Sequence, residues 1–407
     1  MNEAVVGWLL EQSLRRLGRG TLTIVAPDGS ARRYGSGPLA ATMELRSDEV
    51  WAAFLGGSLA LADAFADGLW DSPDLVALVR LAARAMPALD RLRQVAAPVL
   101  RPVELARAAV RPGGRDQRRR DIAAHYDLGN ELFSQMLDPT MTYSCALFGE
   151  AEMSLEDAQL AKLELVCDKL GLGREDRVLE IGSGWGSFAL HAATTRGCHV
   201  TTTTISREQH RHVTERVAAA GLTDLVTVLD KDFRDLRGRY DKLVSIEMIE
   251  AVGWRGFGPF LEHCSTLLEP DGGMLLQAIT IDDRAYAVEK ATRSFIKEYI
   301  FPGGALPSLA VITRALARRT DLQVLGLEDL TVHYVETLRR WRRNLLANAA
   351  HLDELGYDER FRRIWRLYLA YCEGGFAERR IGDVQILLGK PEFRIATPSQ
   401  KAVMIAG

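Results

Sequence analysis

The 407-residue chain has few cysteines, little net charge and no long apolar run, and each shortage excludes a class of protein. Its five cysteines are scattered, odd in number and without a C-x-x-C spacing. This argues against a disulfide framework or a metal site and favours reduced thiols in the cytoplasm. The formal net charge of −3 gives no bulk electrostatic case for nucleic acid. No apolar run reaches the roughly 20 residues that a membrane span needs, and no signal peptide is expected.

The length suggests two domains, and a content of 47% hydrophobic and 26% charged residues is typical of a soluble globular protein. We predict an N-terminal accessory domain at residues 1–101, a basic linker at 102–121 and a catalytic domain at 122–407. Between residues 111 and 120 the linker combines Pro and Gly with arginines. These residues indicate either a flexible connection or a basic strip that meets anionic lipid headgroups.

The first hundred residues predict a small α+β domain. Apolar residues recur at helical spacing over residues 6–17, flanked by arginines, which fits either a helix packed on its own domain or a basic amphipathic helix on a membrane. Residues 21–25 alternate like a strand, and Pro27-Asp28-Gly29 supplies a hairpin turn. Helical patterns follow after Ser47. We find no catalytic constellation in this part.

From residue 121 onward, strand and helix patterns alternate, which predicts a doubly wound α/β sheet. Strands are expected near 177–181, 199–205, 225–229, 240–246 and 273–281, with a further strand at 383–389. Residues 286–318 and 335–380 are expected to be helical insertions that interrupt or cover the sheet.

A glycine-rich turn follows the first of these strands, with Gly182, Gly184 and Gly186 at every second position after Glu180. Glycine lets the chain turn sharply and leaves bare main chain beside a ligand. A dinucleotide fingerprint needs its third glycine one residue later and an acid at the end of the next strand, and both are missing. The alternating pattern is instead that of S-adenosylmethionine (SAM) methyltransferases. A dehydrogenase and a merely structural turn remain the alternatives at this point.

Several polar residues follow strand ends and are expected to meet near this turn. Tyr143, Ser144 and Cys145 lie in a loop just before the domain core, and Glu247 and Glu250 follow the strand at 240–246. Gln277 and Ile279 lie in the strand at 273–281. Taken alone, Cys145 reads as a small buried hydrophobe and Glu250 as a helix-start acid. Their convergence at one sheet edge indicates a functional site.

At these residues the chain resembles the cyclopropane fatty acid synthase family. The matching runs are HYDLGNELF (125–133), MTYSCALF (141–148), LEIGSGWG (179–186), SIEMIEAVG (245–253) and YIFPGGALPS (299–308). The resemblance covers residues 122–390, and AFADGLWD (64–71) is faintly similar to the family's N-terminal lipid-binding domain. It implies a class I SAM-methyltransferase fold that transfers methylene to the cis double bond of an unsaturated acyl chain on a membrane phospholipid.

The resemblance also implies the site residues. The SAM pocket would comprise Tyr143, Ser144, Gly182, Gly184, Gly186, Thr204, Gln209 and Asp232. A bicarbonate ion would act as the base, held by Cys145, Glu250, Gln277, Ile279 and Tyr334. No metal is expected. The protein would be cytoplasmic, bound peripherally to the inner face of the cell membrane, and a homodimer is possible.

Two departures from the family leave the product open. The family often has histidine where Gln277 and Ala251 stand, and glutamine donates a hydrogen bond but cannot change its charge. If deprotonation is poor, the intermediate cation shifts a hydride and ends as a methyl or methylene branch, which is the first alternative. A SAM-fold protein that has lost its chemistry and only binds lipid is the second. Glu247 is the rival to Glu250 as the catalytic acid.

Overall fold

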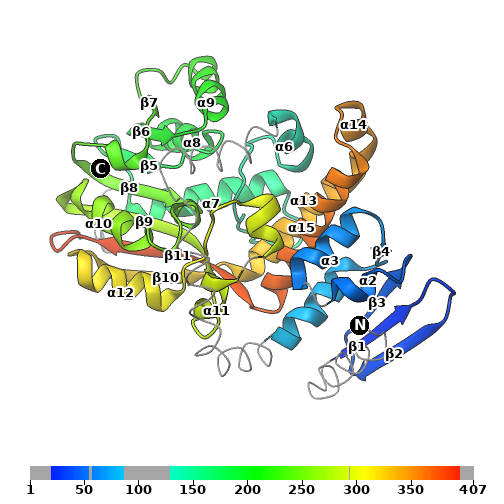
Figure 1. Ribbon diagram of the computed structural model, residues 1–407. Coiled ribbons are helices and arrows are strands. Elements are labelled where there is room, and N and C mark those ends of the chain that lie inside the picture. Colours follow the sequence, from blue (N-terminus) through cyan, green and yellow to red (C-terminus); the bar gives the residue numbers. More distant parts are fainter. Residues whose placement is uncertain (1–19, 55–56, 87–128, 293, 395–407) are drawn as a thin grey trace. The chain divides into compact units, whose positions relative to one another are not determined.

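The computed structural model describes residues 20–54, 57–86, 129–292 and 294–394 (Figure 1). The chain forms two compact units, and neither is continuous in sequence. The first combines residues up to 114 with 284–302 and 334–382, and the second combines 115–283, 303–333 and 383 onward. The helix predicted over residues 6–17 and the basic linker at 102–121 lie outside the described residues.

The first unit contains a four-stranded sheet of order β2-β1-β3-β4. Its strands are β1 (Gly20–Val25), β2 (Ala31–Ser36), β3 (Ala40–Leu45) and β4 (Trp70–Asp71). β1 and β2 form the predicted hairpin, whose turn is closed by a bond from Ala26 N to Ser30 O at 2.8 Å. Asp28 stabilises the turn by accepting from Ser30 N at 2.8 Å. The sequence did not predict β3, which pairs parallel to β1.

Helices from two distant parts of the chain complete the first unit. They are α2 (Val50–Ala53), α3 (Gly57–Ala66), α11 (Tyr286–Ala291), the π-helix η3 (Ile296–Ile300), α13 (Thr331–Ala347), α14 (Ala349–Glu354) and α15 (Glu359–Ala377). α15 packs on α3. The predicted helical insertions therefore exist, but much of them belongs to the first unit. Periodicity reveals a helix without revealing which core it joins.

The second unit is built on a seven-stranded sheet of order β10-β11-β9-β8-β5-β6-β7. Its strands are β5 (Arg177–Ile181), β6 (His199–Thr204), β7 (Val226–Asp230), β8 (Tyr240–Ile246), β9 (Leu268–Ile281), β10 (Gln323–Asp329) and β11 (Ile381–Gly389). β5 to β9 are parallel neighbours, and β10 pairs antiparallel with β11. The predicted doubly wound sheet is confirmed. β10 was not predicted.

Helices connect the strands of this sheet in the second unit. They are α6 (Asn130–Met136), α7 (Leu155–Leu170), α8 (Ser187–Arg196), α9 (Arg207–Ala219), α10 (Phe257–Thr266), α12 (Leu309–Arg319) and the 3-10 turns η1 (Phe233–Asp235) and η2 (Ile249–Val252). α7, α8 and α9 bury their apolar sides in one core with β5, β6 and β8. Because β5, β6, β8 and β9 are parallel, their carboxyl ends meet at one edge. Among the described helices, none has the length and apolarity to cross a membrane.

Candidate active site

The glycine turn after β5 requires glycine for conformational and steric reasons. Gly182, Gly184 and Gly186 have φ of 99°, 50° and 87°, a region that other residues rarely adopt. A Cβ on Gly182 would lie 2.9 Å from Met248 Cγ, and one on Gly186 would lie 2.9 Å from Val213 Cγ1. The turn is fixed to β6 because the N–H groups of residues 182 and 183 both donate to the carbonyl of residue 203, at 3.1 and 3.0 Å. Bare main chain is thus held at the carboxyl edge of the sheet.

An aromatic cluster joins Tyr143 to this turn. The Phe133 ring lies 5.2 Å from the Tyr143 ring and 4.6 Å from the Trp185 ring. Trp185 is the residue between the last two glycines, and its Nε1 donates to Asn130 Oδ1 at 2.8 Å. The structure therefore brings Tyr143 beside the glycine turn, as the sequence predicted. Its role in binding SAM stays a prediction.

The other predicted cofactor residues follow the ends of the neighbouring strands. Thr204 ends β6, and its Oγ1 donates to Gln209 Oε1 in the first turn of α9 at 2.8 Å. Asp232 follows β7 and caps η1 by accepting from Arg234 N at 3.0 Å and Arg234 Nε at 2.8 Å. Thr204 and Gln209 thus form one buried pair, whereas Asp232 is engaged with its own turn.

The loop that carries Ser144 and Cys145 is held by two buried side chains and one half-buried side chain. Gln159 Nε2 donates to Ser144 O at 2.8 Å, and Lys162 Nζ donates to Ser144 Oγ at 2.9 Å. Cys145 N donates to Glu247 Oε1 at 2.8 Å. Gln159 and Lys162 are both fully buried on α7, where amphipathic spacing would normally leave a lysine exposed. The sequence analysis missed both of them.

The charges around Cys145 keep its thiol protonated. Burial raises the pKa of Cys145 well above its usual value, and the nearby carboxyls of Asp383 and Glu247 add to this rise. Burial also lowers the pKa of Lys162, an effect that Glu247 opposes. Because a nucleophilic cysteine needs its thiolate, Cys145 is suited to a hydrogen-bonding role.

Glu250 lies in η2, directly after β8, with one carboxyl oxygen bound and the other unbound. Oε1 accepts from Ile279 N at 2.5 Å, whereas buried Oε2 has no hydrogen-bond partner among the described residues. Burial, with the nearby Glu247 carboxyl, raises the pKa of Glu250 to about 8. The carboxyl is therefore largely protonated at neutral pH and can donate a hydrogen bond to a small anion.

Glu247, Gln277 and Asp383 form a buried polar group beside Glu250. Gln277 Nε2 donates to Glu247 Oε1 at 2.8 Å and to Asp383 Oδ2 at 3.0 Å. Gln277 and Asp383 are fully buried, and Glu247 has a φ of 48°, which is strained for a residue other than glycine. Burial, with the charges of Glu247 and Glu250, raises the pKa of Asp383 well above its usual range. The sequence did not predict Asp383 as a site residue; it is the first residue of the apolar run 383–389.

The structure places four of the five predicted base-holding residues in the second unit. Cys145, Glu250, Gln277 and Ile279 are linked there through the contacts above. Tyr334 belongs to the first unit, where its ring stacks on Phe376 at 4.4 Å and meets Trp341 edge-on at 6.1 Å. The role of Tyr334 at the site stays a prediction.

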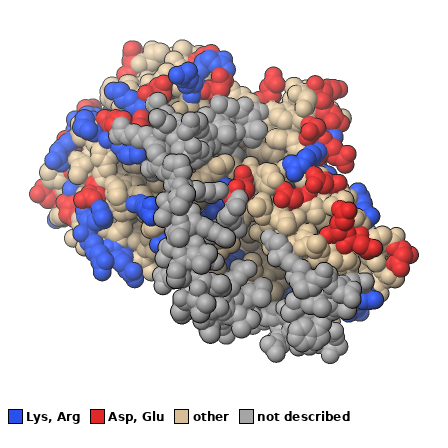
Figure 2. Space-filling model, in the orientation of Figure 1, with Lys and Arg blue, Asp and Glu red and all other residues tan. Residues whose placement is uncertain are grey.

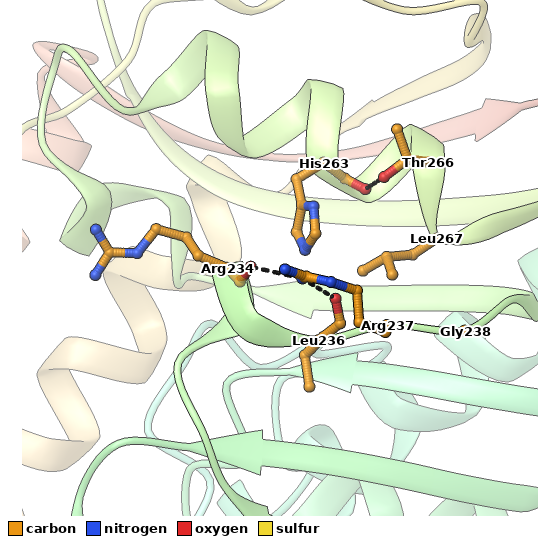
Figure 3. Close-up of a pocket in the computed structure, with 7 residues that line it drawn as sticks. All are labelled: Arg234, Leu236, Arg237, Gly238, His263, Thr266 and Leu267. Carbon is orange, nitrogen blue, oxygen red and sulfur yellow. Dashed lines mark hydrogen bonds between the residues drawn. The ribbon is translucent and has the colours of Figure 1, made fainter.

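A surface hollow in the second unit lies away from the carboxyl edge of the sheet, which carries the glycine turn and Glu250 (Figure 3). Its lining surrounds the loops that lead into the amino ends of β8 and β9, and consists of Arg234, Leu236, Arg237, Gly238, His263, Thr266 and Leu267. Arg237 Nη1 donates to the carbonyls of Arg234 and Leu236 at 2.9 and 2.6 Å, so its cation already serves the fold of its own loop. The hollow is therefore separate from the candidate active site.

Comparison with known proteins now identifies the family. The sequence model of the family described as mycolic acid cyclopropane synthetase matches residues 114–386. A tuberculostearic acid methyltransferase of Mycobacterium tuberculosis is 37% identical over 386 residues, which are 92% of this chain and 88% of that protein. The chain belongs to the mycolic acid cyclopropane synthetase family. The predicted membership in the cyclopropane synthase family is confirmed, and the chain is therefore a member of a family of SAM-dependent methyl and cyclopropane transferases.

Other members of the family match about two thirds of this chain. The cyclopropane-fatty-acyl-phospholipid synthase of Escherichia coli is 38% identical over 266 residues, 65% of this chain and 66% of that protein. A crystal structure of the mycolic acid cyclopropane synthase CmaA1, complexed with SAH and CTAB, matches with a TM-score of 0.63 at 31% identity. It covers 67% of this chain and 98% of that chain. The predicted SAM-methyltransferase fold is thus confirmed.

Proposed function

We propose that this protein transfers a one-carbon unit from SAM to the cis double bond of an unsaturated acyl chain in a membrane phospholipid, and that the product is a cyclopropane ring. The observation that carries the proposal is the Glu250 carboxyl, which is largely protonated at pH 7 and whose buried Oε2 has no partner among the described residues. It follows β8, at the same sheet edge as the glycine turn after β5. The name of the E. coli relative supports this substrate class.

The residues present fit both small groups that the proposal needs. SAM would lie along the bare main chain of residues 182–186, with Tyr143, Ser144 and the Thr204–Gln209 pair around it, and it supplies an electrophilic methyl group. Bicarbonate would be held by Glu250 Oε2, beside the hydrogen-bonded group that contains Cys145, Gln277 and Ile279, and it would supply a base. A protonated carboxyl that lacks an acceptor suits an anion, since two ionised acids would repel each other.

The chain's own residues would then orient the acyl chain, exclude water and stabilise the charge that forms. An alkene is a weak nucleophile, so its carbons must be held in line with the methyl group at near-attack distance. The cation that forms on the acyl chain would lie in a water-poor site, where the carboxyl of Glu247 is worth more than in water. Glu250 would keep the base oriented toward the former methyl carbon, whose proton must leave before the ring closes.

A methyl or methylene branch is the second candidate product, because the M. tuberculosis relative that matches 92% of this chain is named a methyltransferase. A hydride shift in the same cation, followed by loss of a proton, gives a methylene branch. A saturated methyl branch also requires a reductant.

We also propose peripheral association with the inner face of the cell membrane, since the acyl chains of the substrate lie inside a bilayer. Figure 2 shows both basic and acidic side chains on the visible face, so this proposal rests on the substrate and on the arginines between residues 115 and 120 of the sequence. Sedimentation with vesicles of anionic, unsaturated phospholipid should fall as salt rises. Binding that is indifferent to salt would contradict it. A homodimer stays a prediction.

The decisive experiment incubates the purified full chain with SAM and vesicles of a cis-unsaturated phospholipid. Mass spectrometry should find acyl chains heavier by one CH2 unit, and proton NMR should find ring protons. Vinylidene protons would establish the branched alternative instead. Binding of SAM by calorimetry without any product would support the inactive lipid-binding alternative.

A further inference from the structure

We propose that Lys169 and Gln385 are positioning residues that orient the Gln277 amide in the candidate active site, through a one-way chain of hydrogen bonds that begins near the protein surface. This inference rests on the proposed function and deepens it. Neither Lys169 nor Gln385 belongs to the set of residues that the sequence predicted for the site.

The chain of hydrogen bonds lies entirely in the second unit. Lys169 Nζ, on α7, donates to Gln385 Oε1 on β11 at 2.7 Å. Gln385 Nε2 donates to Gln277 Oε1 on β9 at 3.0 Å. Gln277 Nε2 then donates to Glu247 Oε1 and Asp383 Oδ2, at 2.8 and 3.0 Å. The Lys169 side chain is 20% exposed, whereas Gln385 is 1% exposed and Gln277 fully buried.

The direction of this chain follows from what each group can do. An ammonium group donates and never accepts, so the atom of Gln385 that faces Lys169 is its oxygen. The NH2 group of Gln385 must then face Gln277, which turns the Gln277 oxygen toward it. This leaves the Gln277 NH2 group for the two carboxyls. Because both amides are buried, an orientation that set oxygen against oxygen would be costly, and the ammonium therefore selects one arrangement.

The selected arrangement matters at the site because Glu247 Oε1 has a second donor, the main-chain N–H of Cys145 at 2.8 Å. With Gln277 reversed, its oxygen would face Glu247 Oε1 and Asp383 Oδ2, and Glu247 would have to move or gain a proton. Cys145 would then lose or shift its anchor. A misplacement of about 1 Å in a reacting constellation can reduce the rate by roughly 10²-fold.

A merely structural role is the competing explanation, because Lys169 also forms an ion pair with Glu328 on β10. The two explanations separate cleanly. The Glu328 side chain is 47% exposed and lies outside the chain of amides, so Glu328→Gln breaks the ion pair and leaves the donor on Lys169 in place. It is the matched control.

The test compares four variants of the full chain with SAM and vesicles of a cis-unsaturated phospholipid. Gln385→Glu replaces the donor by an acceptor of the same shape and should lower kcat about tenfold or more, and Lys169→Met should lower it about threefold. Lys169→Arg should keep the parent kcat, since arginine can donate to the same oxygen of Gln385. Glu328→Gln should also keep the parent kcat. The KM for SAM should change little. Parent kcat in Gln385→Glu and Lys169→Met, even with a lower melting temperature, would overturn the proposal.

A second measurement is independent of activity. In protein labelled with 15N in its glutamine side chains, the NH2 signals of Gln277 should move in Gln385→Glu and Lys169→Met and stay in place in Glu328→Gln. Unmoved signals in the first two variants would overturn the proposal. If the parent chain yields no transfer product, the proposed function fails, while these NMR signals still decide whether Lys169 and Gln385 orient Gln277.

Discussion

Two clusters of buried charge, one around Arg363 in the first unit and one around Glu250 in the second, are satisfied to different degrees. In the first unit, Arg363 donates to Phe65 O at 2.6 Å, Trp70 O at 2.8 Å and Asp71 Oδ2 at 3.0 Å, and its guanidinium lies 4.2 Å from the centre of the Phe65 ring. In the second unit, Glu250 Oε2 and Asp383 Oδ1 are buried and have no partner among the described residues.

The pKa values follow the same division. Burial acts to raise the pKa of Asp71, but bonds from Ser72 N and Arg363 outweigh it and the net pKa is lowered. In the second unit, burial dominates and the pKa of Glu250 rises to about 8. A satisfied buried charge holds elements of the fold together, whereas an unsatisfied one costs stability and is retained where a site needs it. The comparison thus separates a cluster whose contacts support the fold from one that we propose supports chemistry.

Removing the cation from the satisfied cluster should have the largest effect. Arg363→Ala removes the most buried side-chain donor to the Asp71 carboxyl and a donor to each of the carbonyls of Phe65 and Trp70. We expect the free energy of unfolding to fall by about 3 kcal/mol or more, the usual cost of breaking a buried pair from one side. Urea denaturation followed by circular dichroism measures this loss.

The matched control for that variant is Arg46→Ala. Arg46 also pairs with Asp71, at 3.4 Å, but its side chain is 56% exposed. Exposed pairs contribute little, so the loss should stay below about 1 kcal/mol. Equal losses for Arg46→Ala and Arg363→Ala would mean that burial does not distinguish the two contacts.

The second largest effect is expected at Glu250. In Glu250→Gln, the side-chain oxygen can still accept from Ile279 N. The variant loses the carboxyl that can gain and release a proton, because an amide replaces it. We expect kcat to fall by roughly 10²-fold, the scale of losing one aimed electrostatic group, while the affinity for SAM is nearly unchanged. Steady-state kinetics and calorimetry measure the two quantities. Parent turnover in Glu250→Gln together with impaired Glu247→Gln would transfer the catalytic role to Glu247.

The glycine turn provides a third and smaller effect. Gly186→Ala forces a side chain into a φ of 87° and places its Cβ 2.9 Å from Val213 Cγ1. We expect about a tenfold weaker affinity for SAM, because the turn must shift. Gly221→Ala is the control, since Gly221 has a φ of 68° but an added Cβ would meet nothing within 4 Å. It should lose stability without losing affinity, and weaker SAM binding in Gly221→Ala would contradict this reasoning.

The sheet of the second unit could be predicted largely because its central strands are buried apolar runs. β5 and β8 have the predicted bounds, Arg177–Ile181 and Tyr240–Ile246. β10 could not be predicted, because residues 323–329 are mostly exposed and lack the alternation of a half-buried strand. The packing of α15 on α3 could not be predicted either, because the periodicity of a helix carries no information about which helix it packs against.

The candidate site divides in the same way. The glycines and Glu250 were predicted because they belong to contiguous motifs. Lys162 and Asp383 were not, because their burial depends on how α7 and β11 pack in the folded sheet. A single charged residue in an apolar or amphipathic run gives no local sign of its partner, such as Ser144 for Lys162.

The last effect we predict is an opposite response of the two clusters to pH. In the first unit, the pKa of Asp71 is lowered on folding, so its contribution to stability is present above the ordinary pKa of 3.8 and is lost as pH falls through the folded value. In the second unit, the pKa of Glu250 rises from 4.5 to about 8, so its contribution is fully present below pH 4.5 and is lost as pH rises to about 8. Hydrogen exchange, corrected for intrinsic rates, should therefore show that protection of β8 falls between pH 5 and pH 8 more than protection of α15. Glu250→Gln removes one titrating group and should reduce that fall, and equal slopes in β8 and α15 would show that the two clusters do not differ in the way their contacts indicate.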